Sequence, residues 1–290
     1  LPLITYYGTG RLWLPKRAKK DTIMRDVPSR LHGYVDALDA ATNEKLMLEW
    51  FRQNTFIELQ KQKQIRTFQA VKNAMAEFYR EMDETLEAAL VEYDIESLEI
   101  VLQVKHKAED TVSLPLRYFS DGIKSMLSMT ADIAYRMALL NPNLGENAIA
   151  ETPGIVLIDE IDMHLHPSWQ SRIMSVLKKV FPRVQFIVTT HAPAVLANVP
   201  CENIIAFSEG KAYPLSEHTY GRDVTSILRD VMGAEVRPQD VLQKKDGFYK
   251  ALDNADFSQA EQILADLENT LGKADNDVIY MQTMLDLERA

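Results

Sequence analysis

One stretch, Gly154-Ile-Val-Leu-Ile-Asp-Glu-Ile-Asp162, constrains the fold of this chain more than any other. Its four apolar residues, bounded by Pro153 and Gly154, predict a fully buried strand of a parallel sheet. Two acids, Asp159 and Glu160, follow that strand directly. Ligands of open α/β sheets bind just beyond the carboxyl ends of the strands, so the two carboxylates indicate a site there. The alternative is a strand that ends in a solvated acidic turn.

The composition is that of a globular chain. The 290 residues, 46% of them hydrophobic, are enough for one large domain or two small ones. Because the formal net charge is −10, any contact with nucleic acid has to use local basic patches. Cys201 is the single cysteine, so disulfides do not hold the fold. With no run of about 18 apolar residues and no signal peptide, the sequence predicts a cytoplasmic protein without a membrane span.

The segment Thr42–Tyr93 contains no Gly or Pro and is rich in residues that favour helix. Helices are expected over Asn43–Gln53 and Glu58–Leu90, as a hairpin inserted between strands. Apolar residues at helical spacing mark the buried side of the second helix: Ile65, Phe68, Val71, Ala74, Met75 and Phe78. Ser97–Val104 alternates and predicts a strand, and the chain after Gly221 predicts a helical tail.

Two clusters of positive charge stand out from the acidic background. The first consists of Lys16, Arg17, Lys19 and Lys20, and the second of Lys61, Lys63 and Arg66. Both fit an ordinary solvated surface. The first also fits a contact with the phosphate backbone of a nucleic acid, so this alternative stays open.

Ser120 precedes an apolar helical pattern that runs from Asp121 to about Leu140, and serine is a favoured N-cap residue. Free amides and the helix dipole make such a start an anion site, here with Gly122 in the first turn. The alternative is an ordinary helix cap.

A second apolar strand, Phe186–His191, ends in a polar tip that contains His191. A histidine there is either functional or simply structural. Asp162, His164 and His166 follow the first strand and have the chemistry of zinc or manganese ligands, although an ordinary loop explains the same residues.

The order of these motifs resembles that of the ABC-type P-loop ATPases. Phe119-Ser-Asp-Gly122 resembles their signature motif and Ile155–Glu160 their Walker B motif. Leu165-His-Pro167 is similar to the D-loop of the branch that contains the overcoming-lysogenisation-defect (OLD) and SMC-like ATPases, and Thr190-His191 to the switch histidine. The resemblance covers residues 95–210. The signature departs from Leu-Ser-Gly-Gly, and no glutamine loop can be assigned.

Two shorter stretches, Tyr6–Trp13 and Thr219–Val224, resemble the ATPase family that includes the PtuA subunits of Septu anti-phage systems and of certain retrons. Members of that family act with an HNH nuclease. No stretch matches the phosphate loop Gly-x-x-x-x-Gly-Lys-Ser/Thr. We therefore expect this Walker A motif to lie upstream of Leu1. We also expect these 290 residues to bind ATP only weakly on their own.

The resemblance implies a nucleotide held between two heads of an oligomer. Asp159 would hold Mg²⁺, directly or through water, Glu160 would orient the lytic water, and His191 would contact the γ-phosphate. Ser120 and Gly122 would reach the γ-phosphate of ATP bound to the opposite subunit. The D-loop residues Asp162, His164 and His166 would lie at the dimer seam.

The expected fold class is therefore α/β: an ABC-type P-loop NTPase core with a mostly parallel sheet, an inserted helical hairpin, a helical C-terminal tail and an N-terminal lobe lacking Walker A. Residues 1–41 and 95–220 would form the ATPase core, 42–94 the helical insertion and 221–290 the tail.

The expected function is that of an ATP-binding and ATP-hydrolysing subunit in anti-phage defence, with ATP and Mg²⁺ as cofactors. Expected partners are further copies of the chain, as a homodimer or a higher homo-oligomer, an HNH-type nuclease, and DNA or retron nucleic acid. One alternative is a nucleotide-responsive scaffold with slow hydrolysis. Another is an OLD-type or DNA-repair ATPase, although the helical tail lacks the strand-end acids of a Toprim nuclease.

Overall fold

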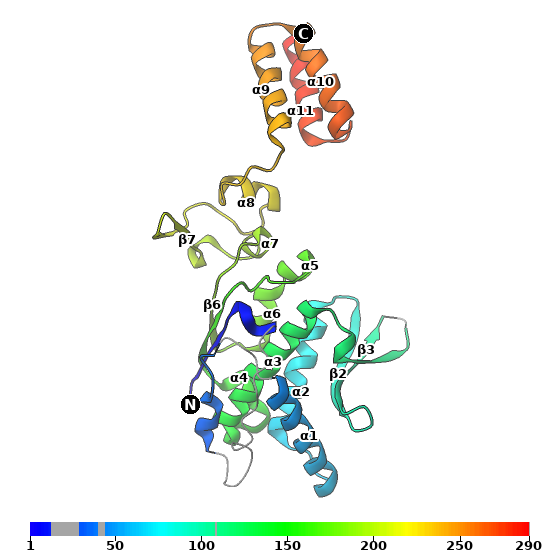
Figure 1. Cartoon of the computed structure of the whole chain (residues 1–290), viewed down its shortest axis with the longest axis vertical. Coiled ribbons are helices and arrows are strands. Elements are labelled where there is room, and N and C mark those ends of the chain that lie inside the picture. The colour runs from blue at the N-terminus through cyan, green and yellow to red at the C-terminus, as the bar shows by residue number, and fades with distance from the viewer. Residues whose placement is uncertain (13–28, 40–43, 108, 290) are drawn as a thin grey trace. The chain divides into compact units, whose positions relative to one another are not determined.

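The computed structural model describes residues 1–12, 29–39, 44–107 and 109–289 (Figure 1). The chain forms two compact units, Leu1–Val224 and Thr225–Ala290. Each unit has a hydrophobic core of its own. The basic cluster of Lys16, Arg17, Lys19 and Lys20 lies outside the described residues.

The first unit is built on a parallel sheet of three strands in the order β1-β5-β6. These strands are β1 (Leu3–Tyr7), β5 (Gly154–Ile158) and β6 (Val184–Val188). A Cβ atom at Gly154 would lie 2.6 Å from the Cβ of Leu3, so glycine is needed where β1 and β5 approach. The predicted parallel strand before Asp159 is confirmed.

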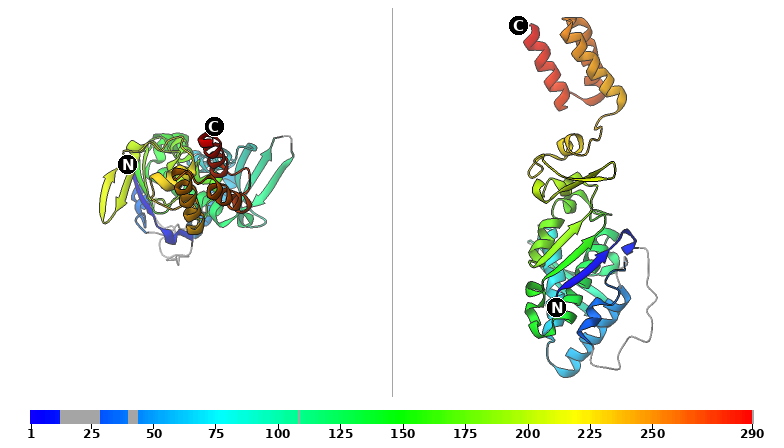
Figure 2. Two further views of the ribbon diagram at one scale, coloured as in Figure 1. Left: turned by 90° about the horizontal axis from the view of Figure 1, so that it is seen from above. Right: turned by 90° about the vertical axis from the view of Figure 1, so that its left-hand side faces the viewer.

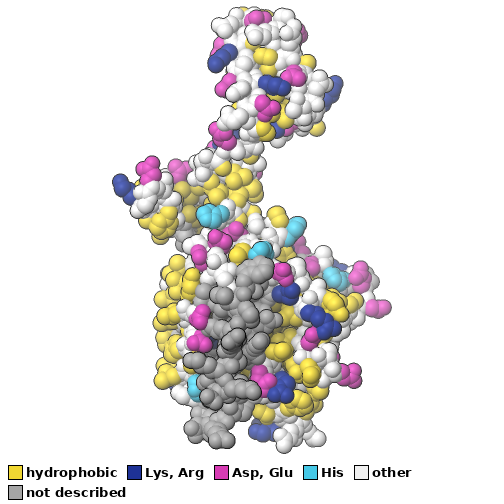
Figure 3. All heavy atoms as spheres, in the orientation of Figure 1, with side chains coloured by type: hydrophobic (Ala, Val, Ile, Leu, Met, Phe, Trp, Pro, Cys, Tyr) yellow, Lys and Arg dark blue, Asp and Glu magenta, His cyan; other side chains and the backbone are white. Residues whose placement is uncertain are grey.

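The two faces of this sheet differ in burial. Leu3, Thr5 and Val156 on the inner face are buried. On the outer face Ile155 keeps 39% and Ile187 keeps 49% of its surface exposed, so the expectation that β5 is buried on both faces is wrong for the described part of the chain. The right-hand view of Figure 2 looks onto this sheet. In Figure 3, apolar side chains gather along the left edge of the first unit, which is the side that faces the viewer in that view.

Helices cover the inner face of the sheet (Figure 1). Buried residues line almost the whole length of α3 (Asp121–Leu140), which packs against α2 (Arg66–Met82) and β1. Trp50 of α1 (Glu44–Lys61) lies edge-on to Phe68 of α2 and Tyr135 of α3. Around these helices lie α4 (Ala148–Glu151) and 3-10 turns at Thr9–Leu12, Arg30–Tyr34, Leu116–Tyr118 and Pro142–Asn147.

The long second helix expected over Glu58–Leu90 is wrong in both bounds. Helix α1 continues to Lys61, α2 begins at Arg66 and ends at Met82, and Leu86–Asp94 is strand β2. β2 pairs antiparallel with β3 (Glu99–His106), which pairs with β4 (Thr111–Pro115). The predicted buried side of α2 is confirmed from Phe68 to Phe78, because those apolar residues pack on α3.

The chain after β5 consists of short elements. Residues 167–180 contain two helices, α5 (Pro167–Gln170) and α6 (Ile173–Val180). After β6 come α7 (Pro193–Leu196), a 3-10 turn at Cys201–Asn203, and a hairpin of β7 (Ile205–Ser208) and β8 (Lys211–Pro214). Glu209 and Gly210 both have positive φ, which the tight hairpin turn requires.

The second unit is helical, as predicted. It contains α9 (Gln239–Asp253), α10 (Phe257–Leu271) and α11 (Asn276–Arg289), and α8 (Val224–Asp230) begins at the boundary between the units. Helix α10 packs against both α9 and α11 around a core that includes Phe248, Leu264 and Met281. Arg237 and Lys245 pair with Asp275 and Asp277 next to this core.

Candidate functional site

Two strands of the parallel sheet deliver the predicted site residues to one edge. Ile158 of β5 lies opposite Val188 of β6, so the residues that follow these strands leave the sheet side by side. Asp159 and Glu160 follow β5, and Thr189–His191 follow β6. Asp159 and Glu160 are both partly buried, whereas His191 is exposed.

The Thr189 hydroxyl connects the two acids that follow β5. It donates a hydrogen bond to Asp159 Oδ1 at 2.5 Å and accepts one from the Glu160 backbone N–H at 2.8 Å. The Asp159 N–H donates to the carbonyl of Tyr7 at 2.8 Å, on the other neighbouring strand. Asp159 is therefore oriented by both of the strands that flank β5.

Thr190 holds the next acid in the same manner. Its hydroxyl donates to Asp162 Oδ1 at 2.5 Å and accepts from the backbone N–H of Ala192 at 3.0 Å. Sequence reasoning missed both threonines as site residues. Its only signal was the polar tip of the strand, and the hydroxyl–acid pairs appear only once β5 and β6 are placed in register.

The loop after β5 stores backbone strain. Glu160 and His164 have φ angles of 47° and 61°, a region that non-glycine residues adopt at a cost of about 1–3 kcal/mol. Hydrogen bonds close two successive turns, from Met163 N–H to Glu160 and from Leu165 N–H to Asp162, each 3.0 Å long. Strain of this kind persists only where the surroundings enforce it, and it concentrates at functional sites.

The first turn of α3 touches this strained loop. Ser120 is the N-cap, as predicted, and its exposed hydroxyl accepts from the Ile123 N–H at 3.4 Å. Gly122 is buried, and a Cβ atom there would lie 2.2 Å from the His164 carbonyl oxygen. Glycine is thus required for α3 to contact the loop. A hydrogen bond from Lys124 lowers the pKa of Asp121, with a smaller contribution from the nearby His164.

The trio Asp162, His164 and His166 does not converge on one point. Asp162 binds Thr190, and the His166 ring lies 2.7 Å from the Ser168 hydroxyl at the start of α5. His164 is exposed beside Asp121. Among the described residues, no group of three His, Cys, Asp or Glu side chains is placed to hold a metal ion, so the zinc or manganese alternative has no structural support.

A buried polar network joins α3 to the same sheet. The Tyr7 hydroxyl donates to Asp132 Oδ2 at 2.7 Å, and Arg136 Nε donates to the same oxygen at 2.8 Å. Arg136 also donates to the carbonyls of Gly33 and Val35. Burial and the Asp132 carboxylate raise the pKa of Tyr7 well above its ordinary value, so Tyr7 remains a donor. This network fixes α3, and with it Ser120, relative to β1.

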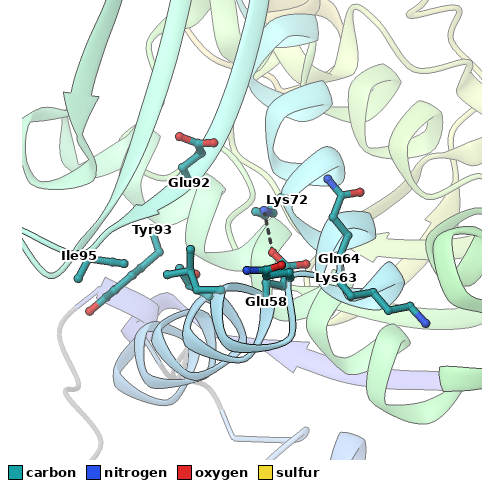
Figure 4. Close-up of a pocket in the computed structure, with 10 residues that line it drawn as sticks. Glu58, Lys63, Gln64, Lys72, Glu92, Tyr93 and Ile95 are labelled. Carbon is teal, nitrogen blue, oxygen red and sulfur yellow. Dashed lines mark ion pairs between the residues drawn. The ribbon is translucent and has the colours of Figure 1, made fainter.

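A separate cavity of about 400 Å³ lies between the end of α1, the start of α2 and β2 (Figure 4). Glu58 and Lys72 face each other there at 3.8 Å, and Glu58 also accepts a hydrogen bond from Gln69. Lys63, of the second basic cluster, also lines this cavity. None of the predicted site residues does, so the cavity is not part of the strand-end site.

A known protein family matches the part of the chain that contains these residues. Residues 24–197, more than half of the chain, match the family described as "AAA domain, putative AbiEii toxin, Type IV TA system". The chain belongs to this AAA domain family. The resemblance to ABC-type ATPases of defence systems and the α/β fold class predicted from the motifs are confirmed.

The similar curated proteins include a retron ATPase and a Septu protein. The chain is 42% identical over 130 residues to "Retron Ec83 probable ATPase" of Escherichia coli, a match that covers 45% of this chain and 24% of that protein. It is 31% identical over 145 residues to "Septu protein PtuA" of Bacillus thuringiensis, covering 47% of this chain and 37% of that protein. The chain thus spans less than half the length of these relatives.

One solved structure with a similar chain comes from a study of ATP-driven dimerization and DNA-stimulated activation of SMC ATPases. The match covers 59% of this chain and 96% of the solved chain, with 20% identity and a TM-score of 0.38.

Within the described residues, no helix has both the length and the apolar character that a membrane span needs.

Proposed function

We propose that this chain is the part of a defence ATPase that carries the hydrolytic acids, and that it acts on Mg²⁺–ATP. The observation that supports this most is the pair of strand-end acids held by the Thr189 hydroxyl beside a strained backbone. A neutral hydroxyl orients a carboxylate without cancelling its charge.

Asp159 fits a magnesium ligand. It is a partly buried carboxylate at the carboxyl end of a parallel strand, and Mg²⁺ is commonly held by one or two carboxylates together with substrate phosphates. When bound, the ion supplies positive charge against the phosphate oxygens. Asp159, oriented by the Thr189 hydroxyl and by the Tyr7 carbonyl, would hold the ion through its carboxylate.

Glu160 would orient the attacking water and accept its proton. Its backbone is fixed by the Thr189 hydroxyl and by the left-handed φ angle, so the side chain leaves the strand in a set direction. His191 is exposed on the neighbouring strand end and would donate to a phosphate oxygen. These are positioning and electrostatic roles, which dominate phosphoryl transfer.

The test is Mg²⁺-dependent ATP hydrolysis by the full-length protein that contains this chain. Glu160→Gln should retain ATP binding and lower turnover by a factor of about 10² or more, because the group that orients the water is lost. Glu151→Gln, at an exposed glutamate of α4, is the matched control and should leave turnover unchanged. Equal turnover in both variants would remove Glu160 from the mechanism.

We also propose that Ser120 acts on ATP held by a second copy of the chain. Its hydroxyl is exposed at the start of α3, while the buried Gly122 holds that helix start against the loop. If Ser120 is only a cap, Ser120→Ala costs about 1 kcal/mol of stability and leaves hydrolysis intact. If it completes a composite site, the variant folds and binds ATP but hydrolyses it slowly.

A mixing experiment separates these two roles of Ser120. Ser120→Ala protein is combined with a protein whose phosphate loop is inactivated but whose Ser120 is intact. Mixed dimers then contain one complete composite site, and part of the activity should return. Subunit exchange is verified with two affinity tags. Verified mixed dimers with no restored activity would leave Ser120 as a helix cap.

The names of the relatives support a role in anti-phage defence, and we propose an HNH-type nuclease and DNA as the partners that ATP turnover controls. A scaffold with slow hydrolysis is the second candidate. Both make a clear prediction for the full-length protein co-expressed with its nuclease. If ATP turnover controls the nuclease, Glu160→Gln changes plasmid cleavage and DNA stimulates ATP turnover. If the protein is a scaffold, ATP binding alone suffices for plasmid cleavage and DNA has no effect on ATP turnover.

A further inference from the structure

Helix α11 is apolar on two opposite sides. Val278, Met281 and Leu285 are buried against the rest of the second unit. On the other side, Ile279 keeps 52%, Tyr280 keeps 57% and Leu287 keeps 67% of its surface exposed. A helix that packs on one neighbour only normally carries charged or polar residues on its outer side. α11 therefore has the character of a helix covered on both sides.

The exposed residues form a continuous stripe. Ile279, Thr283 and Leu287 follow each other at four-residue spacing, with Tyr280 beside them, and the row spans about 12 Å of the helix. Its side-chain polar atoms are the hydroxyls of Thr283 and Tyr280, and the Thr283 hydroxyl already donates to the Ile279 carbonyl at 2.8 Å. The stripe thus offers a charge-free strip two turns long. That is the shape against which a second helix packs.

The unit around this stripe is strongly acidic. Residues 225–290 contain seven Lys and Arg against 13 Asp and Glu, a formal charge of −6 out of the −10 of the whole chain. Five of the seven basic side chains already pair with an acid of the same unit: Arg229, Arg237, Lys244, Lys245 and Arg289. Asp286 and Glu288 flank Leu287 at the end of the stripe.

We propose that the stripe of Ile279, Tyr280, Thr283 and Leu287 is the docking site for a basic amphipathic helix of a protein partner. The apolar side of such a helix would cover the stripe, and its Lys and Arg residues would face the surplus acids. A nucleic acid would meet a unit of charge −6, and a second copy would bring the same charge against it. The inference is independent of the proposed ATP site.

Fluorescence anisotropy of a labelled peptide tests the docking site on the full-length protein. The probe is a Leu/Lys amphipathic helix of about 18 residues, long enough to be helical. Its controls are the same peptide with Glu in place of Lys, and a shuffled Leu/Lys peptide without an apolar side. We expect the ordered Leu/Lys peptide to bind at least about tenfold more tightly than either control.

Matched variants locate the binding on α11. Ile279→Gln combined with Leu287→Gln should weaken binding at least about tenfold, because two apolar anchors are lost. Ala265→Gln combined with Ala274→Gln, at exposed positions elsewhere in the unit, should leave it unchanged. The double variant Asp286→Lys, Glu288→Lys reverses two acids beside the stripe. Its control, Asp246→Lys with Asp253→Lys, changes the net charge equally but lies on α9. The first should weaken peptide binding about threefold more than the second.

Four results would overturn the proposal. The first is the absence of binding by the ordered peptide, and the second is equal binding of the Glu peptide. The third is self-association in analytical ultracentrifugation that Ile279→Gln with Leu287→Gln abolishes, since a second copy would then occupy the stripe. The fourth is duplex DNA binding that the same pair of substitutions removes.

Discussion

Acidic side chains are held in two different ways at two places in this chain, after β5 and in the helical second unit. After β5, Asp159 and Asp162 are each oriented by a threonine hydroxyl, which is neutral. In the helical unit, Asp275 and Asp277 are held by the cations of Arg237 and Lys245. A hydroxyl fixes the geometry of a carboxylate and leaves its negative charge in place, whereas a cation neutralises it. The first arrangement suits a metal and phosphate site, and the second suits a structural cross-link.

The largest effect is expected where the strained loop meets α3. Gly122→Ala should destabilise the first unit by about 1–3 kcal/mol, because a new Cβ atom 2.2 Å from the His164 carbonyl forces the loop or the helix to move. Hydrolysis should fall with it. Hydrogen exchange resolved by peptide measures the change in each unit separately.

Gly247→Ala in α9 is the matched control for this glycine. Its Cβ atom would meet only Ile263 Cδ1, at 3.5 Å, which is ordinary contact. Alanine favours helix over glycine, so this variant should stabilise the second unit by up to about 1 kcal/mol. The same sign of effect at both glycines would contradict the packing of Gly122 on the loop.

Removal of one hydroxyl tests the neutral way of holding an acid. Thr189→Val should lower ATP turnover by about 10- to 100-fold, since a hydrogen bond to a charged group contributes about 1.5–3 kcal/mol. Thr189→Ser keeps the hydroxyl and should keep most of the activity. Turnover measured at saturating ATP compares the two. A valine variant as active as the serine variant would mean that Thr189 does not orient Asp159.

Removal of a cation from the helical unit should have a smaller effect. Arg237→Met leaves Asp275 and Asp277 without this partner and should cost about 1 kcal/mol or less of the stability of that unit, because the pair is partly exposed. ATP turnover should not change. Arg229→Met removes an exposed pair with the adjacent Asp230 and should be neutral. A loss of turnover in the Arg237 variant would break the division of roles between the units.

The smallest expected effect is a pH dependence. The hydrogen bond from Arg237 lowers the pKa of Asp275 below its ordinary value. The stabilisation is therefore complete above the unfolded pKa near 3.8 and is lost as the pH falls through the lower folded value. Thermal unfolding followed by NMR at the methyl groups of Met281 and Leu285 should show this loss, and Asp275→Asn should remove it. An identical acid profile in the variant would assign the dependence to other groups.

The sequence predicted those features that depend on neighbours along the chain. The strand before Asp159 and the Ser120 cap each carry a local signal, and both are present. The order of the motifs was enough to indicate the ATPase family. The roles assigned to Glu160, His191 and Ser120 stay predictions.

The sequence was misleading where partners are distant. Leu86–Asp94 has the composition of a helix, yet it is a strand because β3 offers it a hydrogen-bonding edge. Ile155 and Ile187 have the apolar character of fully buried strand residues, but their face of the sheet is exposed in the described part of the chain. Neither the link from Thr189 to Asp159 nor the contact of Gly122 with His164 has any signature in spacing alone.

The claim that the acids after β5 are held for a cation is tested most directly by manganese binding. The full-length Glu160→Gln protein is saturated with ATP, and Mn²⁺ affinity is measured by electron paramagnetic resonance. Adding Asp159→Asn should weaken Mn²⁺ binding by at least about tenfold, whereas adding Asp275→Asn should leave it unchanged. Equal Mn²⁺ affinity in the two double variants would contradict the account.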